Sequence, residues 1–273
     1  MTDAVTRWRN DLQAWAIPAE ILAAAAESPW TLDPGTFVAR ARRQVIEPSG
    51  ESYQRAVEVL PADGSVLDVG AGAGAASLAL AGRAGRLTGV DPNRALLETF
   101  VSLANDRSIE MEAVVGEWPE RASSVAVADV VVCHHVLYNV ADLAPFVTAL
   151  STYARNRVVV EISATHPMTP WNPLWLRFHG LTRPRTPTAA DAVDAIAELG
   201  HAPHALYWER PATLDAVSYS ELVATTRRRL CLGPDRAGDV DTALRDLGVD
   251  PAAPTLGGPT RRLATIWWAG TAD

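Results

Sequence analysis

The stretch that decides the fold is VLDVGAGAGAASLALAG, residues 66–82. An apolar run carries Asp68, and Gly70, Gly72 and Gly74 then alternate with alanines before a run of small residues. Glycines at the end of a strand let the backbone approach a ligand closely and adopt turns that other residues avoid. The stretch therefore predicts a strand, a glycine-rich ligand-binding loop and a helix over residues 74–81.

Around this loop, short apolar runs alternate with helical patterns. The expected strands cover residues 65–70, 86–91, 109–116, 128–135, 157–163, 203–210 and 261–270, with helices over 92–104 and 142–153. Such alternation is typical of a parallel sheet with helices on both faces. A last strand that inserts beside the sixth one runs antiparallel. The pattern predicts a Rossmann-like α/β fold with a seven-stranded, mostly parallel sheet and an antiparallel C-terminal strand.

Four parts of the chain follow from this pattern. Residues 1–60 have helical patterns without a strand of their own, and we expect them to form a helical lid over the carboxyl ends of the strands. Residues 61–210 are the expected α/β core and residues 211–259 a helical insertion. Residues 260–273 are the C-terminal strand that completes the core sheet.

Two residue pairs have the spacing of capping boxes, which start helices. Thr188 with Asp191 and Ser218 with Glu221 each place an acid three residues after a hydroxyl. Gly248 is typical of a residue that follows the end of a helix. These signals predict helices after residues 188 and 218, the second of them inside the insertion.

The composition favours a globular protein of a reducing compartment. The 273 residues are 48% hydrophobic, and the formal net charge of −8 disfavours a nucleic-acid partner, which requires a basic surface. Cys133 and Cys231 are too few for a disulfide framework or a zinc site. No apolar signal core or membrane span is evident. We expect a cytoplasmic protein without a metal, membrane or nucleic-acid partner. All 24 basic residues are Arg, which indicates a GC-rich bacterial source.

Two cofactors suit the glycine loop. Gly70, Gly72 and Ala75 satisfy the loose dinucleotide fingerprint, and Asp91 follows at roughly the ~20-residue distance of a ribose-binding acid. Asp68 favours another cofactor, because a dinucleotide has no evident use for a carboxylate there and a cofactor with an ammonium group does. From these residues alone, an NAD(P)-dependent oxidoreductase stays open.

The combination resembles the class I, seven-stranded S-adenosylmethionine-dependent methyltransferases. Residues 68–74, DVGAGAG, are similar to the acid-Gly-x-Gly-x-Gly motif of that family, and residues 89–93, GVDPN, are similar to its second motif. The likeness covers residues 60–165 and extends to the C-terminus by strand order. It implies S-adenosyl-L-methionine as the cofactor.

The resemblance also implies which residues contact the cofactor. The ten candidates are Asp68, Gly70, Ala71, Gly72, Gly74, Asp91, Pro92, Glu117, Trp118 and His134. Asp68 would accept from the methionine ammonium, Asp91 would bind both ribose hydroxyls, and Glu117 would accept from the adenine amino group. Trp118 would either stack on the adenine or pack in the core.

Three residues at strand ends are the candidate catalytic groups: His135, Tyr138 and His166. Imidazole titrates near neutrality, which suits removal of a proton from a hydroxyl acceptor. We expect His135, or failing it His166, to be that base. A nitrogen acceptor that is already neutral needs no base, and the histidines would then be packing or hydrogen-bonding residues.

Trp30, Trp171 and Trp175 are the candidates for the wall of an acceptor pocket. Trp171 and Trp175 are four residues apart, so one helical face carries both rings. Such a face can wall an apolar pocket, or it can fix the Pro- and Trp-rich segment 164–187 to the core.

The residues after the fourth strand, CHHV at 133–136, replace the Asn/Asp-Pro-Pro-aromatic motif of adenine-type nucleic-acid methyltransferases. The favoured function is therefore methyl transfer from S-adenosylmethionine to a small, partly apolar metabolite. An NAD(P)-dependent oxidoreductase and a non-catalytic S-adenosylmethionine-binding regulatory protein are the alternatives.

Overall fold

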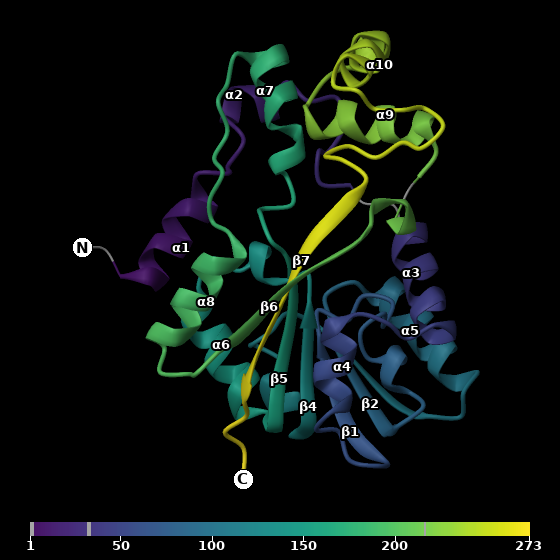
Figure 1. Ribbon diagram of the computed structural model, residues 1–273, viewed down its shortest axis with the longest axis vertical. Helices are drawn as coiled ribbons and strands as arrows, with labels where there is room; N and C mark the ends of the chain where they lie inside the picture. The colour runs from purple at the N-terminus through teal and green to yellow at the C-terminus, as the bar shows by residue number, and fades with distance from the viewer. Residues whose placement is uncertain (1–2, 32–33, 216) are drawn as a thin grey trace.

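One sheet organises the molecule in the computed structural model, which describes residues 3–31, 34–215 and 217–273 (Figure 1). Its seven strands have the order β3-β2-β1-β4-β5-β7-β6. They are β1 (Gly64–Val69), β2 (Ala84–Asp91), β3 (Glu110–Val115), β4 (Ala128–His134), β5 (Ala154–Ser163), β6 (His204–Pro211) and β7 (Thr260–Ala269). β7 pairs antiparallel with β5 and β6, and the other pairs are parallel. The predicted seven-stranded, mostly parallel sheet is confirmed.

Helices cover both faces of this sheet, as predicted. They are α1 (Ala4–Gln13), α2 (Ala19–Ala23), α3 (Pro34–Ile46), α4 (Glu51–Val57), α5 (Arg94–Asn105), α6 (Leu143–Thr152), α7 (Asn172–His179), α8 (Ala189–Glu198), α9 (Tyr219–Arg229) and α10 (Ala237–Asp246). Helices α1, α6 and α8 bury apolar residues against one face, and α3, α4 and α5 against the other. None of the helices in the described residues has the length and apolarity that a bilayer span requires.

Side chains alternate between the two faces along each strand. In β1, Leu67 and Val69 belong to the core on the α6 side, and Val66 belongs to the core on the α5 side. Asp68 therefore projects toward α3, α4 and α5. By the same alternation His134 at the end of β4 and Glu161 in β5 project to that side, which places three polar residues on one face.

The predicted helix over residues 74–81 is wrong: turns and a short 3-10 helix, η1 (Leu78–Leu80), occupy this stretch. Gly74 has a φ of +83°, outside the helical region. Asp68 Oδ2 also accepts from the backbone N–H of Ser77 at 3.3 Å and from its hydroxyl at 2.6 Å. That side chain replaces a helical bond at Ser77, so the loop is fastened to β1 instead of continuing as a helix.

Both capping boxes are present at the predicted helix starts. Thr188 precedes α8 and Ser218 precedes α9. The hydroxyl of each accepts from the backbone N–H of the acid three residues on, and that acid accepts from the backbone N–H of the hydroxyl residue. Gly248, with a φ of +79°, follows α10. Helices α7, α9 and α10 gather beyond the carboxyl ends of the parallel strands (Figure 1) and share a third apolar core with residues of the α2 segment.

The predicted N-terminal lid is divided among three places. Helix α1 packs on α6 and α8, where Trp8 Nε1 donates to the carbonyl of Val140 at 2.8 Å. The α2 segment joins the third core, and α3 and α4 cover the opposite face of the sheet. Residues 1, 2, 32 and 33 of the predicted lid, and residue 216 of the predicted insertion, lie outside the described residues. A lid function stays a prediction.

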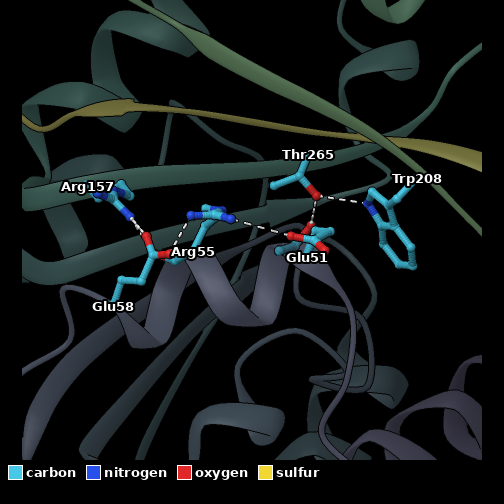
Figure 2. Close-up of polar contacts among 7 residues, drawn as sticks. Glu51, Arg55, Glu58, Arg157, Trp208 and Thr265 are labelled. Atoms are coloured by element: carbon cyan, nitrogen blue, oxygen red, sulfur yellow. Dashed lines mark hydrogen bonds and ion pairs between the residues drawn. The ribbon is translucent and has the colours of Figure 1, made fainter.

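Helix α4 is tied to the antiparallel edge of the sheet by polar contacts (Figure 2). Ser52 Oγ lies 2.7 Å from Thr265 Oγ1 in β7, and Trp208 Nε1 in β6 donates to the same oxygen at 3.0 Å. At the other end of the helix, Arg157 pairs with Glu58 at 2.7 Å. These contacts hold α4 along β5 and β7, with Ser52 in its first turn on the cavity side.

We predict that Gly74→Ala destabilises the fold. A β-carbon at Gly74 would lie 2.3 Å from the Phe100 ring, and the φ of +83° is unfavourable for any other residue. Overpacking and strain together cost about 2–4 kcal/mol, to be measured by urea unfolding. Gly238→Ala in α10 is the control, because a β-carbon there meets nothing within 4 Å and stabilises a helix by about 0.5–1 kcal/mol. Equal stability of the two variants would contradict the packing role of Gly74.

Candidate functional site

A cavity of about 660 Å³ lies at the carboxyl ends of β1, β2, β4 and β5. Its walls are the glycine loop, the residues that follow β2, β3 and β4, and the facing sides of α3 and α4. Nine of the ten predicted cofactor-contacting residues line it, and Gly74 does not. His135 lines it as well, whereas the other predicted catalytic and pocket residues lie elsewhere.

The three glycines of the loop are explained by two different structural requirements. A β-carbon at Gly70 would lie 2.3 Å from Val136, and one at Gly74 would strike Phe100. At Gly72 the nearest atoms would be 3.8 Å away, so the space beside it is open to the cavity. Gly70 and Gly74 let the loop pack on its neighbours, and Gly72 leaves room for a ligand against the backbone.

Asp91 fixes the loop to the end of β2. Its Oδ2 accepts from the backbone N–H of Gly72 at 2.8 Å, and its Oδ1 accepts from that of Asn93 at 2.7 Å. Each carboxylate oxygen can accept a further hydrogen bond. Because Asp91 lines the cavity, this second capacity suits a pair of ligand hydroxyls.

Asp68 lies under the loop and is 1% exposed. Burial raises its pKa to about 7, against the opposing hydrogen bonds from Ser77 and with a smaller contribution from the charge of Asp91. Near neutral pH the carboxyl is therefore divided between its two protonation states. A ligand ammonium beside it would favour the ionised form.

The residues after β3 differ in their exposure. Glu117 is exposed at the cavity rim, whereas Trp118 is 9% exposed. Trp118 Nε1 donates to the carbonyl of Phe146 at 3.4 Å, and its ring meets Tyr153 edge-on at 5.4 Å. Trp118 thus packs in the core with one part of its ring on the cavity wall.

His134 presents a polar atom without a partner to the site. Its Nε2 is buried and has no hydrogen-bond partner among the described residues. Burial lowers the pKa of His134 to about 4 despite the opposing charge of Glu161, so the ring is neutral at pH 7. A buried polar atom left unpaired is costly, which fits a wall built to face a ligand.

His135 joins a charged cluster with Arg40 from α3 and Glu161 from β5. His135 Nε2 lies 3.0 Å from Glu161 Oε1 and 2.7 Å from an Arg40 guanidinium nitrogen. The backbone N–H of His135, at a φ of +61°, donates to the carbonyl of Glu161 at 2.6 Å. Burial, and next the charge of Arg40, lower the pKa of His135. The imidazole is therefore neutral at pH 7 and pre-positioned by β5.

Tyr138 and His166, predicted as catalytic, lie outside the cavity. The Tyr138 hydroxyl donates to the carbonyl of Ser163 at 2.9 Å, and burial raises its pKa. The His166 ring stacks on Trp15 at 3.9 Å and is 7% exposed. Both side chains join the loops after β4 and β5 to the N-terminal segment, so packing explains them.

The three tryptophans predicted for the acceptor pocket do not line the cavity either. Trp175 is 2% exposed in the third core, and Trp171 Nε1 donates to Thr226 Oγ1 at 3.3 Å. Trp30 is 53% exposed and lies 6.0 Å from the guanidinium of Arg229. Trp171 and Trp175 pack residues 164–187 against the third core, which fits the packing alternative that their spacing left open.

Helices α3 and α4 supply the residues that sequence reasoning missed. They line the cavity with Phe37, Arg40, Gln44, Ser52, Tyr53 and Ala56. No motif marks these positions in the sequence. Glu161 had a signal, since it is the one acid within the apolar run VVVEI, as Asp68 is within VLDV. No group of three or more metal-ligating side chains occurs in the part of the chain that the structure describes.

Comparison with known families gives one match, over residues 39–198, to the model described as a methyltransferase domain. The sequence has no significant match among curated proteins.

Among solved structures, YcgJ from Bacillus subtilis is similar with a TM-score of 0.54 at 18% identity, covering 81% of this chain and 98% of that one. A putative methyltransferase (BH2331) from Bacillus halodurans C-125 gives 0.54 at 13% identity, with the same 81% and 98% coverage. Magnesium protoporphyrin IX methyltransferase (ChlM) from Synechocystis PCC 6803, solved with bound SAH, gives 0.51 at 14% identity, covering 96% and 95%. At these identities the likeness establishes the fold.

We predict that Asp68→Asn removes a pH dependence of stability. The pKa of Asp68 is about 7 in the folded protein and near 3.8 when unfolded. Because the pKa is raised in the folded protein, the contribution of Asp68 to the free energy of unfolding is complete below about pH 4 and is lost as the pH rises to about 7. Between pH 5 and pH 8 the free energy of unfolding of the wild type should therefore fall by about 2 kcal/mol more than that of the variant. Urea unfolding at both pH values measures the difference.

Asp129→Asn is the matched control. Hydrogen bonds from Ser65 outweigh burial and lower the pKa of Asp129, so its contribution is lost only in acid, below the pH 5–8 window. In this variant the free energy of unfolding should change between pH 5 and pH 8 as it does in the wild type. If Asp68→Asn also shows the wild-type change, the Asp68 carboxyl is ionised throughout this range and the prediction is contradicted.

Proposed function

The chain belongs to the family of methyltransferase domains, in its class I, seven-stranded form, and from this premise we propose that it is an S-adenosylmethionine-dependent methyltransferase of a small, partly apolar metabolite. The observation that carries the proposal is a single cavity with two kinds of lining. The glycine loop, Asp68 and Asp91 line it from the sheet, and α3 and α4 line it from the helical layer. Such a cavity suits a cofactor and an acceptor side by side.

The residues present fit the cofactor. Asp91 has capacity for two ribose hydroxyls, the open space beside Gly72 admits a ligand against the backbone, and Asp68 suits an ammonium group. Glu117 at the rim is placed to accept from an adenine amino group. When bound, S-adenosylmethionine supplies an electrophilic methyl group on a sulfonium sulfur.

The chain's own contribution is alignment and exclusion of water. Orientation of two reactants is worth about 7–11 kcal/mol in favourable cases, and the cavity walls on α3, α4 and the loop after β4 provide it. A hydroxyl acceptor also needs a base. His135 lines the cavity and is held by β5 in its neutral form, so we assign it that role and exclude His166 and Tyr138 from it.

We predict that the protein binds S-adenosylhomocysteine (SAH), the demethylated cofactor, and not NADH, in parallel calorimetric titrations. Gly72→Val should abolish SAH binding, because its side chain would occupy the ligand space. Asp91→Ala should weaken binding about tenfold or more through lost charged hydrogen bonds. Asp246→Ala, which removes an exposed acid paired with Arg177, is the control and should bind normally.

Tight NADH binding would favour the oxidoreductase alternative. SAH binding without methyl transfer from labelled S-adenosylmethionine into an extract of the source organism would favour a non-catalytic binding protein. Unchanged SAH affinity in both Gly72→Val and Asp91→Ala would sink the cofactor assignment.

We predict that His135→Ala lowers kcat by ~10²–10⁴ for a hydroxyl acceptor, once mass identification of the labelled product provides one. His166→Ala should stay within a few-fold of wild type, since its ring packs on Trp15. Because the pKa of His135 is lowered, wild-type kcat/KM should fall only as the pH drops below about 6.5. If both variants keep kcat within a few-fold across pH 6–9, neither histidine is the base.

A further inference from the structure

Glu161 is a buried acid in a strand that is otherwise apolar around it. It is 7% exposed, lies near the carboxyl end of β5 and lines the cavity. Its Oε1 faces His135 Nε2 at 3.0 Å and an Arg40 guanidinium nitrogen at 3.6 Å. Its Oε2 has no partner among the residues that the structure describes. One oxygen is therefore held in place and the other is available.

The carboxylate is ionised at neutral pH. Burial by itself would raise the pKa of Glu161, but the facing groups bring it below its usual value. Because both imidazoles are neutral at pH 7, the hydrogen bond from His135 and the charge of Arg40 are what favour the carboxylate there. Oε2 is not among the fully buried atoms that lack a partner, so it is accessible from the cavity, whereas Nε2 of His134 is fully buried and unpaired. A ligand donor that reaches Oε2 therefore meets an ionised acceptor.

Glu161 lies apart from the cofactor candidates in the sheet. Asp68 and Asp91 lie on β1 and β2, whereas Glu161 lies on β5, with β4 between β1 and β5. Tyr53 of α4 adds aromatic surface to the same cavity, and the small side chain of Ala56 leaves room for an apolar body.

Resting on the proposed methyltransferase function, we propose that Glu161 selects the methyl acceptor: its Oε2 accepts a hydrogen bond from a hydroxyl or amino group on a small, neutral molecule with an apolar body. His135 and Arg40 hold the other oxygen and so fix the direction in which Oε2 accepts. A carboxylate or phosphate at this position would meet a like charge, so anionic acceptors are excluded.

Four small probes that share one ring test this selection. Phenol and aniline carry a neutral hydrogen-bond donor, toluene carries none, and benzoate carries a negative charge. Each is titrated by ligand-observed NMR into the full chain, with and without saturating SAH. Phenol and aniline should bind at least about tenfold more tightly than toluene, the difference expected of a hydrogen bond to a charged group. Benzoate should not bind.

Glu161→Gln keeps the shape of the side chain and removes its charge. Phenol and aniline should lose about tenfold or more in affinity. Benzoate should gain affinity, because the like charge is removed and the new amide can donate. A gain in benzoate affinity cannot come from misfolding of the variant. Asp129→Asn, a carboxylate-to-amide change near the start of β4, is the matched control and should bind all four probes as the wild type does.

The proposal is overturned if no donor probe binds, if toluene or benzoate binds as well as phenol, or if Glu161→Gln leaves the ranking unchanged. It is also overturned if Glu161→Gln weakens SAH about tenfold with probe binding intact, since Glu161 would then serve the cofactor. Failure of the methyltransferase function is a separate result. It appears as absent SAH binding in the wild type, while the probes without SAH still report on Glu161.

Discussion

The hydrogen bond from the Gly72 backbone to Asp91 holds the site open. At 2.8 Å it joins the glycine loop to the end of β2, beside the bond from Gly70 N–H to the carbonyl of Val90, also 2.8 Å. These two bonds fix the position of the loop relative to the sheet. The space between the loop, α3 and the end of β4 is the cavity, and the other residues of the site line it.

Two buried acids of the sheet line the cavity. Asp68 and Glu161 interrupt apolar strands, project to the same face and are both almost fully buried. Burial opposes ionisation in each, but their surroundings differ. Among the described residues only Ser77 donates to Asp68, whose pKa is about 7, whereas the charge of Arg40 and a hydrogen bond from His135 favour the ionised form of Glu161. Two buried acids thus present different charges to one cavity.

The N-terminal helices serve the site by lying on opposite faces of the sheet. Helix α1 secures the loop after β4 through Trp8, which donates to Val140 and stacks on Tyr138 at 5.6 Å. Helices α3 and α4 close the cavity from the other side, with Arg40 reaching His135 and Ser52 bonded to Thr265. The same segment therefore packs on the loop after β4 and lines the cavity.

The sequence by itself determined the seven strands, the glycine loop, Asp91 and the two capping boxes. Each of these depends on neighbours within a few residues or on the regular alternation of apolar runs with helical patterns. It failed at residues 74–81, where the Asp68 side chain replaces a helical bond at Ser77. Only the tertiary structure decided which strand-end groups reach the cavity. Arg40 and His135 are 95 positions apart in the chain, and no local pattern encodes their meeting. His166 also follows a strand, yet Trp15 stacks on its ring and holds it outside. Position at a strand end is a property of the sequence, whereas the direction of a side chain depends on what packs against it.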